Sequence, residues 1–536
     1  MEVRLEGLWA LALDENNLGE KEEWFIPEHY PQETVDYRSP AFLFDVPFKD
    51  KKRGWLKKEF DFTKHVKTLV YLIFFGVDEC KVWLNGEFAG RLYNTAGKQV
   101  LEVSKLISDK NTLILKFERI QPETLGVWKY AYVIEDSPVP ALSKKMISHT
   151  PKWLDQVVLY SIFIRNFSPE GTFNGVTEKL PQLKAMGVNT IWLLPIHPVG
   201  LKERKGTLGS PYAIKDYYAV NPEFGTKEDF KRLVDTAHSM DIRVIIDLVI
   251  NHTSPDSVMK DIDPKFYKHH TEQQNAAWGW TDVLELDYSY APTRKYITEM
   301  MEYWIREFNI DGYRCDVAFL VPLDFWQSAI ARIRALKKNI FMLAEADNPE
   351  LYPVGFDLTY DWNLMLTLRR INRGFYPFYE ILEYVQTQYQ YYPQYARRMI
   401  FLENHDTPRA VETFTPDFLI PFNVLKFILP GIPLIYNGEE VGIKNTPSLF
   451  DRDPIDWSIK NSALLEFYKE IIKVKKSYPS LNYHFADGFD FSYDHSSVKI
   501  HRFDSEKFLE IVFENPALNS YFVSNGKIRK TFQNVL

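Results

Sequence analysis

From residue 156 onward, short apolar runs alternate with amphipathic helical segments, and this rhythm constrains the fold more than any other feature. Such alternation is typical of parallel strands joined by helical crossovers. Candidate strands begin near Val157, Asn189, Arg243, Asp311, Ile340, Phe356, Met399 and Ile432. Candidate helices cover residues 176–186, 227–240, 292–308 and 322–337, with a last one near 464–476. Eight strands in this order favour a closed (β/α)8 barrel of the TIM type, an α/β fold, over an open sheet.

The barrel is predicted to be one of three domains, because 536 residues exceed what a single hydrophobic core usually supports. Before it, apolar runs with a hairpin signal at Asn85-Gly86 predict an N-terminal β-sandwich. Prolines mark a linker between the two. The predicted parts are the sandwich at 1–135, the linker at 136–152, the barrel at 153–480 and a small C-terminal β domain at 481–536. Within the barrel, residues 253–285 form an excursion after the third strand, long enough to fold over the barrel mouth.

Charge and cysteine content narrow the possible partners and the compartment. The net charge is -8, from 64 basic and 72 acidic residues, which gives no extended basic face and argues against nucleic acid as a partner. The two cysteines, Cys80 and Cys315, are placed in different domains, so no disulfide framework is predicted. No segment reads as a signal peptide or is long and apolar enough to span a membrane. We therefore expect a cytoplasmic protein without a membrane partner; the oligomeric state stays open.

Four short stretches place a carboxylate or histidine where an apolar run ends. They are residues 247–252 (DLVINH), 312–316 (GYRCD), 343–345 (LAE) and 403–406 (ENHD). Acids are rarely buried unless they meet a partner or a substrate. In the predicted barrel these stretches lie at the carboxyl ends of the third, fourth, fifth and seventh strands, which is the rim where barrel enzymes build their sites. One shared active site is the expectation.

These four motifs, in this order and spacing, resemble glycoside hydrolase family 13, the α-amylase family. The resemblance covers roughly residues 156–457, and a C-terminal β domain stands where the family usually has one. Accessory matches are residues 209–212 with 216–217, residues 221–226 and residues 451–457. Each motif is weak alone, but the set in order is highly specific.

The resemblance implies Asp316 as nucleophile, Glu345 as general acid/base and Asp406 as the residue that stabilises the transition state. Arg314 lies two residues before Asp316 on the same strand face, so we expect its cation to lower the pKa of Asp316 and to fix its orientation. Glu345 follows the apolar residues 341–344 and has no adjacent basic residue, which suits an acid that must keep its proton.

The resemblance also implies a substrate-binding set. In the family, the equivalents of His252 and His405 hydrogen-bond sugar hydroxyls, the equivalent of Asp247 supports the arginine network, and that of Tyr212 stacks under the sugar ring. Three further acids, Asp287, Asp357 and Asp361, are interpreted as structural. Cys315 is expected to point to the other strand face and to pack there.

No cofactor is required for this chemistry, but calcium is left open. Asn251 is a calcium ligand in many relatives. The excursion offers additional carboxylates, without the spacing of a recognisable oxygen cage: Asp256, Asp261, Asp263 and Asp282.

Two features of the sequence, one in the barrel and one in the N-terminal part, bear on which sugars the protein binds. Residues 317–319 (VAF) stand where many endo-acting α-amylases carry a Lys-His pair that touches leaving-group sugars, so the leaving-group preference is open. The N-terminal part resembles the galactose-binding-like sandwich of several glycosidases, chiefly through residues 82–86. Trp83 could bind glucan there, although tryptophan in a sandwich is usually core.

The sequence therefore predicts an enzyme that cleaves α-1,4-glucosidic bonds in starch-like glucans or maltooligosaccharides with retention of configuration. A 4-α-glucanotransferase and an exo-acting α-glucosidase would use the same catalytic residues and remain alternatives. A catalytically silent relative or a carbohydrate-binding scaffold is a third class. The presence of all three acids, Asp316, Glu345 and Asp406, argues against it.

Overall fold

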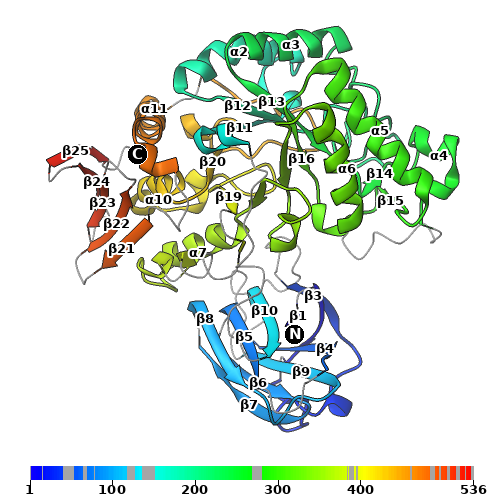
Figure 1. Cartoon of the computed structure of the whole chain (residues 1–536), viewed down its shortest axis with the longest axis vertical. Coiled ribbons are helices and arrows are strands. Elements are labelled where there is room, and N and C mark those ends of the chain that lie inside the picture. The colour runs from blue at the N-terminus through cyan, green and yellow to red at the C-terminus, as the bar shows by residue number, and fades with distance from the viewer. Residues whose placement is uncertain are drawn as a thin grey trace. The chain divides into compact units, whose positions relative to one another are not determined.

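The chain divides into two compact units (Figure 1). One comprises Met1–Lys145 with Trp362–Gln394, and the other comprises Met146–Asp361 with Tyr395–Leu536. The computed structural model describes all residues except 1, 6, 15, 40–52, 64–68, 78, 94, 118–126, 136–150, 269–279, 383, 386–391, 394–395, 459–460, 483–488, 494–496, 504–507, 515–518, 525–526 and 533–536. Most of the predicted linker at 136–152 falls outside the described residues, and the predicted domain boundaries stay predictions.

The N-terminal part of the first unit consists of two antiparallel sheets. Their strand orders are β1-β10-β5-β8 and β3-β2-β4-β9-β6-β7. The strands are β1 (Glu2–Arg4), β2 (Gly7–Leu13), β3 (Val35–Ser39), β4 (Gly54–Asp61), β5 (Val70–Val77), β6 (Cys80–Leu84), β7 (Glu87–Leu92), β8 (Thr95–Glu102), β9 (Lys110–Phe117) and β10 (Val127–Glu135). As the hairpin signal predicted, Asn85 and Gly86 form the turn between β6 and β7, both with positive φ. Helix α7 (Trp362–Asn372) groups with this unit.

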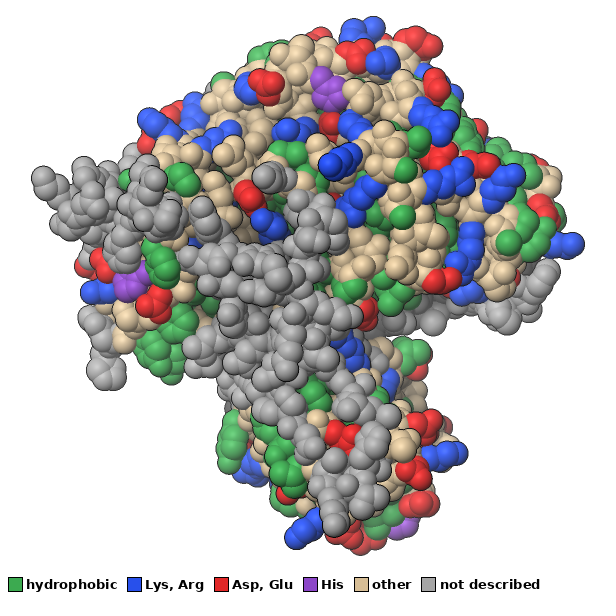
Figure 2. All heavy atoms as spheres, in the orientation of Figure 1, with side chains coloured by type: hydrophobic (Ala, Val, Ile, Leu, Met, Phe, Trp, Pro, Cys, Tyr) green, Lys and Arg blue, Asp and Glu red, His purple; other side chains and the backbone are tan. Residues whose placement is uncertain are grey.

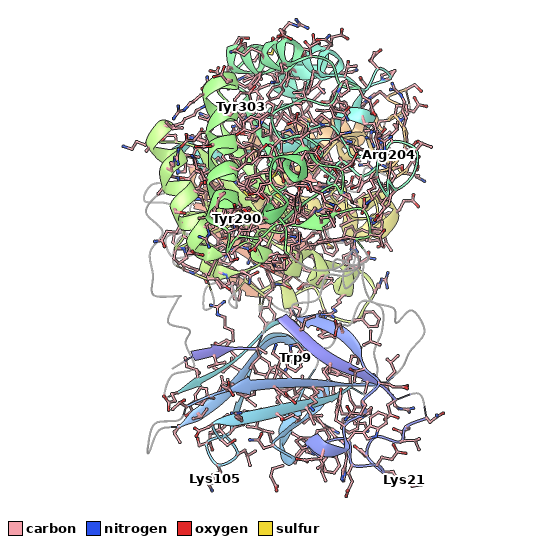
Figure 3. All side chains as sticks on the ribbon, turned by 90° about the vertical axis from the view of Figure 1, so that its right-hand side faces the viewer. Trp9, Lys21, Lys105, Arg204, Tyr290 and Tyr303 are labelled. Carbon is pink, nitrogen blue, oxygen red and sulfur yellow. The ribbon has the colours of Figure 1, made fainter. Side chains whose placement is uncertain are left out.

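Tryptophans fill the core of this part rather than lining its surface. Trp9, labelled in Figure 3, is buried and donates its indole N–H to the Leu5 carbonyl oxygen over 2.8 Å. Trp83 is only 7% exposed, and its ring stacks between Trp55, with centroids 5.5 Å apart, and Phe25, at 5.4 Å. Because both faces of the Trp83 ring have partners, its described role is packing.

The second unit is built on a closed parallel barrel, which confirms the predicted fold class (Figure 1). Its strands are β11 (Leu159–Ile162), β12 (Thr190–Leu193), β13 (Arg243–Leu248), β16 (Gly312–Cys315), β17 (Phe341–Ala344), β18 (Leu358–Tyr360), β19 (Arg397–Ile400) and β20 (Ile432–Tyr436). Helices on the barrel include α2 (Phe173–Met186), α3 (Lys227–Ser239), α5 (Ala291–Phe308), α6 (Leu323–Leu336), α10 (Pro416–Ile428) and α11 (Ser462–Ser477). The strands are almost fully buried, as continuous apolar runs predict for parallel strands covered by helices.

Two further parts of this unit were expected from the sequence. The excursion after β13 contains a short ribbon of β14 (His252–Thr253) and β15 (Leu284–Glu285), with helix α4 (Val258–Ile262) between them. The C-terminal part forms a sheet with the order β21-β22-β23-β24-β25. These strands are Phe489–Tyr493, Ser497–Phe503, Phe508–Glu514, Asn519–Ser524 and Lys527–Phe532. Among the described residues, no helix combines the length and the apolar character needed to cross a bilayer.

Gly312 begins β16 at a place where the barrel wall leaves no room for a side chain. A Cβ atom there would lie 2.3 Å from the carbonyl oxygen of Phe341 on the neighbouring strand β17. Because that oxygen belongs to the backbone, it cannot move aside without disturbing the strand pairing. This close approach explains the glycine that starts the GYRCD motif.

We predict that Gly312→Ala destabilises the barrel by about 1–3 kcal/mol or more, as expected for overpacking. Gly442→Ala is the comparison, since its Cβ would meet nothing nearer than 3.3 Å and its cost is the positive φ of 70°. That cost is about 1–2 kcal/mol. Urea unfolding followed by tryptophan fluorescence measures both, and a midpoint for Gly312→Ala at or above that of Gly442→Ala would contradict the steric argument.

Candidate active site

The register of three neighbouring strands brings the motif residues to one level of the barrel rim. Asp247 in β13 is paired directly with Arg314 in β16. One step further, the Asp316 N–H donates to the Leu248 carbonyl oxygen over 3.0 Å, and the Glu345 N–H donates to the Cys315 carbonyl oxygen over 2.9 Å. Parallel pairing thus continues past the last strand residues and places Asp316 and Glu345 side by side at the carboxyl ends.

Arg314 lies at the centre of the site and is completely buried. Its Nη1 donates to both oxygens of Asp247, over 2.8 and 3.1 Å, and to Asp316 Oδ1 over 2.9 Å. Its Nη2 lies 2.9 Å from Glu345 Oε2. Burial acts to lower the pKa of Arg314, but Asp247 and Glu345 outweigh it, so the pKa is raised and the guanidinium stays charged.

An aromatic wall surrounds this guanidinium. The ring centroids of Trp192, Tyr360 and Tyr212 lie 5.1, 5.6 and 5.7 Å from its central carbon. Trp192 Nε1 donates to Asp247 Oδ2 over 3.2 Å, and Arg314 Nε donates to the Tyr360 hydroxyl over 3.0 Å. Sequence reasoning missed Trp192 and Tyr360. The available signal was an aromatic residue near the carboxyl end of a predicted barrel strand.

The turn after Asp316 carries backbone strain. Val317 has φ 37° and ψ 47°, a left-handed conformation that β-branched residues rarely adopt. In this conformation the Val317 N–H donates to Glu345 Oε2 over 2.8 Å. Oε2 therefore accepts from Val317 N–H and is ion-paired with Arg314 Nη2, which leaves Oε1 as the oxygen that can carry a proton.

Burial raises the pKa of Glu345 to about 7, although Arg314 opposes the shift. Burial also raises the pKa of Asp316, despite the opposing effect of Arg314, with Asp247 and Asp406 adding to the increase. The expectation of a lowered pKa for Asp316 is therefore wrong: Arg314 does act to lower it, but burial of the carboxyl group outweighs the cation. Glu345 acts to lower the pKa of Asp316, whereas Asp316 acts to raise that of Glu345. This mutual effect favours Glu345 as the acid that keeps a proton.

Two neutral histidines flank the carboxyl groups. Burial lowers the pKa of His252 to about 4, and burial together with Arg314 lowers the pKa of His405 well below its usual value. His252 Nε2 lies 3.9 Å from Asp316 Oδ2. His405 Nε2 lies 2.5 Å from the Tyr212 hydroxyl and 3.2 Å from Asp406 Oδ2. Because both rings are uncharged, they can hydrogen-bond a neutral ligand without adding charge to the site.

Tyr212 and Asp406 complete the predicted set. The half-buried Tyr212 ring is stacked on His405, with centroids 5.5 Å apart and planes 16° from parallel, and its hydroxyl donates to Asp247 Oδ2 over 3.3 Å. Asp406 is the most open of the acids, with a side chain 33% exposed. All eight residues predicted for catalysis and substrate binding thus lie in one connected group, in which Arg314, Tyr212 and the two histidines link the carboxyl groups.

The loop that carries His405 and Asp406 is held from below by a buried ion pair. Arg409 Nη1 donates to Glu403 Oε1 over 2.6 Å, and the Ala410 N–H donates to Glu403 Oε2 over 2.5 Å. Arg409 also donates to the Asn437 carbonyl oxygen after β20, over 3.0 Å. These contacts link the segment after β19 to the segment after β20 and so hold Asp406 in place at the rim.

The residues considered for calcium do not form a common oxygen cage. Asn251 Nδ2 lies 3.2 Å from His252 Nδ1. Asp256 accepts from Leu201 N–H, Asp263 accepts from Lys265 N–H, and Asp282 pairs with Lys205 over 3.0 Å. Across the part of the chain that the structure describes, no group of three histidine, cysteine or acidic side chains is arranged to hold a metal ion. Among the described residues, these side chains therefore give no support for a calcium site.

The residues interpreted as structural have structural contacts. Asp357 accepts from the Met342 N–H and from Arg334, both over 2.9 Å. Asp361 lies 3.6 Å from Arg398, and Asp287 accepts from the Ser289 N–H over 2.8 Å. Cys315 is fully buried, and burial raises the pKa of its thiol. Such a thiol packs and is not a reactive nucleophile.

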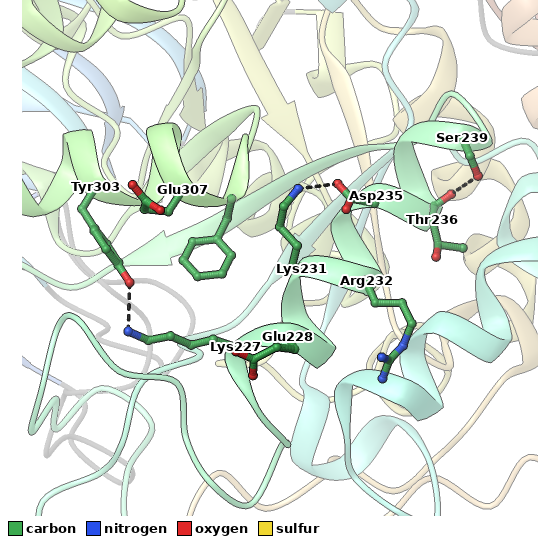
Figure 4. Close-up of a pocket in the computed structure, with 10 residues that line it drawn as sticks. Lys227, Glu228, Lys231, Arg232, Asp235, Thr236, Ser239, Tyr303 and Glu307 are labelled. Atoms are coloured by element: carbon green, nitrogen blue, oxygen red, sulfur yellow. Dashed lines mark hydrogen bonds and ion pairs between the residues drawn. The ribbon is translucent and has the colours of Figure 1, made fainter.

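A groove of about 740 Å³ lies outside the barrel, between α3 and α5 (Figure 4). Its charged side chains are largely satisfied by neighbours: Lys227 donates to the Tyr303 hydroxyl over 2.9 Å, and Lys231 pairs with Asp235 over 2.7 Å. On the face shown in Figure 2, basic and acidic side chains are interspersed over the helices of this unit. The groove therefore offers no concentration of one charge, and we assign it no chemistry.

The chain is similar in sequence and in structure to known proteins. Residues 134–280 and 261–476 match the family model described as "Alpha amylase, catalytic domain". A crystal structure of an alpha-amylase from Lactobacillus plantarum is 34% identical, with a TM-score of 0.64, and covers 72% of this chain and 98% of that one. A maltogenic alpha-amylase from Thermotoga neapolitana is 30% identical, with a TM-score of 0.63, over 71% and 95%.

A curated relative, alpha-amylase 2 of Dictyoglomus thermophilum, is 28% identical over 62% of this chain and 65% of its own length. Alpha-amylase MalA of Haloarcula japonica is 26% identical over 62% of this chain and 50% of its own. The chain thus spans about half to two thirds of the length of these curated relatives.

We predict that Asp247→Ala lowers the free energy of unfolding by about 1–3 kcal/mol, because it deprives the buried donors Arg314 Nη1 and Trp192 Nε1 of this acceptor. The control is Glu412→Ala, which breaks a surface pair with Lys444 at 3.9 Å between side chains 51% and 79% exposed. That change is expected to cost less than about 0.5 kcal/mol. Chemical unfolding of the two variants in parallel measures the difference, and equal losses would contradict the role of Asp247 in holding Arg314.

Proposed function

The chain belongs to the alpha-amylase family, and on this premise we propose that it cleaves α-1,4-glucosidic bonds in maltooligosaccharides or starch-like glucans with retention of configuration. The observation that carries the proposal is the Arg314-bridged pair of Asp316 and Glu345 at the barrel rim. Nη1 of Arg314 donates to Asp316 Oδ1 over 2.9 Å, and its Nη2 lies 2.9 Å from Glu345 Oε2. Retaining enzymes hold their two carboxyl groups about 5 Å apart, whereas inverting enzymes separate them by about 6.5–9.5 Å to admit a water molecule. Two carboxyl groups that share one guanidinium favour retention.

In the first step, Asp316 attacks the anomeric carbon and forms a covalent glycosyl-enzyme. Its Oδ1 is held by Arg314 Nη1, so Oδ2 is the oxygen left to attack. Glu345 gives its proton to the leaving oxygen at the same time. Because Oε2 is occupied by Val317 N–H and Arg314, that proton leaves from Oε1.

In the second step, Glu345 takes a proton from an incoming water molecule or sugar hydroxyl, which displaces Asp316 from the anomeric carbon. Asp406 carries negative charge at the exposed edge of the group, where it can oppose the positive charge that develops on the sugar ring. The neutral His252 and His405 can hydrogen-bond sugar hydroxyls on either side.

A 4-α-glucanotransferase would use the same residues, because only the acceptor in the second step differs. An exo-acting α-glucosidase would likewise share them, with a site closed at one end. The similar protein from Thermotoga neapolitana is a maltogenic alpha-amylase, and this supports hydrolysis over the glucanotransferase and the α-glucosidase alternatives. We also propose a cytoplasmic location, supported by two buried cysteines that remain thiols.

We predict that Asp316→Asn lowers kcat on maltooligosaccharides by about 10⁴-fold or more while the fold is kept, since the amide cannot form the intermediate. Glu345→Gln should lower kcat strongly with maltooligosaccharides and much less with α-maltosyl fluoride, whose leaving group needs no proton. Chromatography of products and fluoride release measure the two cases. Near-normal activity of Asp316→Asn on either substrate would contradict the nucleophile assignment.

We predict that the alkaline limb of the pH profile reflects Glu345. Its pKa is raised to about 7, so it holds the required proton below that pH and loses it as the pH rises through about 7. The kcat/KM for maltooligosaccharides should therefore fall above pH 7. With α-maltosyl fluoride the same limb should be absent, and an identical alkaline limb for both substrates would assign it to another group.

A further inference from the structure

Trp280 is an aromatic side chain at the rim that the predicted catalytic set does not include. It lies in the excursion after β13 and is half-buried. Its ring centroid is 5.4 Å from that of His252, with the planes tilted by 51°. His252 Nε2 in turn lies 3.9 Å from Asp316 Oδ2. His252 is therefore a neighbour of both the indole and the proposed nucleophile.

Backbone hydrogen bonds hold the main chain that follows Trp280. The ribbon pairs His252 with Glu285 and Thr253 with Leu284, and the Leu286 N–H donates to the Asn251 carbonyl oxygen over 2.9 Å. These bonds fix the segment that follows Trp280 against the segment that carries His252. The position of the indole relative to Asp316 is thus set by backbone hydrogen bonds and not by the indole contact alone.

The loop after β12 also contacts Trp280 and its neighbours. Trp280 packs against a small cluster of Val199, Ala213 and Val283. Next to it, Lys205 in the loop after β12 pairs with Asp282 over 3.0 Å. Arg204 of the same loop, labelled in Figure 3, donates to the Gly200 carbonyl oxygen over 3.1 Å and so ties the loop to itself. Two loops therefore brace one partly exposed indole beside the catalytic acids.

The chemistry of an indole in this position fits a sugar ring. Tryptophan offers a large, rigid apolar face at a low cost in side-chain entropy, and a pyranose presents apolar C–H groups on its faces. His252 lies beside both residues, since its ring centroid is 5.4 Å from that of Trp280 and its Nε2 is 3.9 Å from Asp316 Oδ2. A glucosyl unit next to the one that reacts at Asp316 is therefore expected to lie near Trp280. A cation–π contact with His252 is not involved, since burial lowers the pKa of that imidazole to about 4.

We infer that Trp280 is a specificity-determining residue that packs against the glucosyl unit next to the reacting one. The inference rests on the proposed function and extends it: Trp280 sets the preference for oligosaccharides over single sugars, while the chemistry on the reacting unit depends on Asp316, Glu345 and Asp406.

The test measures binding of two probes by calorimetry in an Asp316→Asn background, so that neither probe is turned over. Adding Trp280→Ala should weaken maltotetraose binding by about 10-fold, the loss expected for one aromatic stacking contact. Binding of 1-deoxynojirimycin, which fills only the place of the reacting sugar, should change by less than about 2-fold. Trp280→Phe, which keeps a ring, should recover most of the maltotetraose affinity.

Trp24→Ala, the same change at a half-buried tryptophan of the first unit, is the matched control and should leave both affinities unchanged. Equal weakening of both probes by Trp280→Ala would overturn the inference, because the effect would then pass through His252. Unchanged binding of both probes would overturn it as well. If the Asp316→Asn protein without further changes binds neither probe and the wild type shows no glucan cleavage, the proposed function itself has failed, and this result is distinct from a failure of Trp280 alone.

Discussion

The buried guanidinium of Arg314 is the interaction on which the site depends. A fully buried cation costs several kcal/mol to remove from water, and the barrel compensates this with three carboxyl groups and a wall of aromatic rings. In return, each of Asp247, Asp316 and Glu345 has one oxygen fixed in direction. Because one positive charge cannot neutralise three acids, a proton must stay in the group. Glu345 can act as the general acid because the single positive charge of Arg314 is too little for all three carboxyl groups.

Burial explains why the two histidines are neutral. It lowers the pKa of His252, and at His405 the nearby Arg314 lowers the pKa further. The strained, left-handed conformation of Val317 also contributes to the site, because it directs the Val317 N–H to Glu345. Two of the three catalytic acids are thus positioned by the backbone of strand ends, and the third by the Glu403–Arg409 pair below it.

Much of this could be predicted because it is encoded locally. Apolar runs of four to six residues mark the barrel strands, and the predicted starts fall within two residues of the observed ones. The hairpin at Asn85-Gly86 follows from the positive φ that these two residues tolerate. The eight predicted catalytic and binding residues lie next to strand ends, and the family resemblance assigned their roles. Trp192 and Tyr360 were missed because a buried aromatic residue in a strand looks the same whether it lines a core or a site.

The amino-acid sequence by itself determined the order of strands, the family and the identity of the acids, because periodicity and motif spacing are properties of the chain alone. Only the tertiary structure decided how the charges are shared. Arg314 is distant from Glu345 in the chain, yet strand pairing places their side chains 2.9 Å apart, so Glu345 shares the cation with Asp247 and Asp316. Burial then raises the pKa of both acids, since desolvation depends on everything packed around a group and not on its neighbours in sequence.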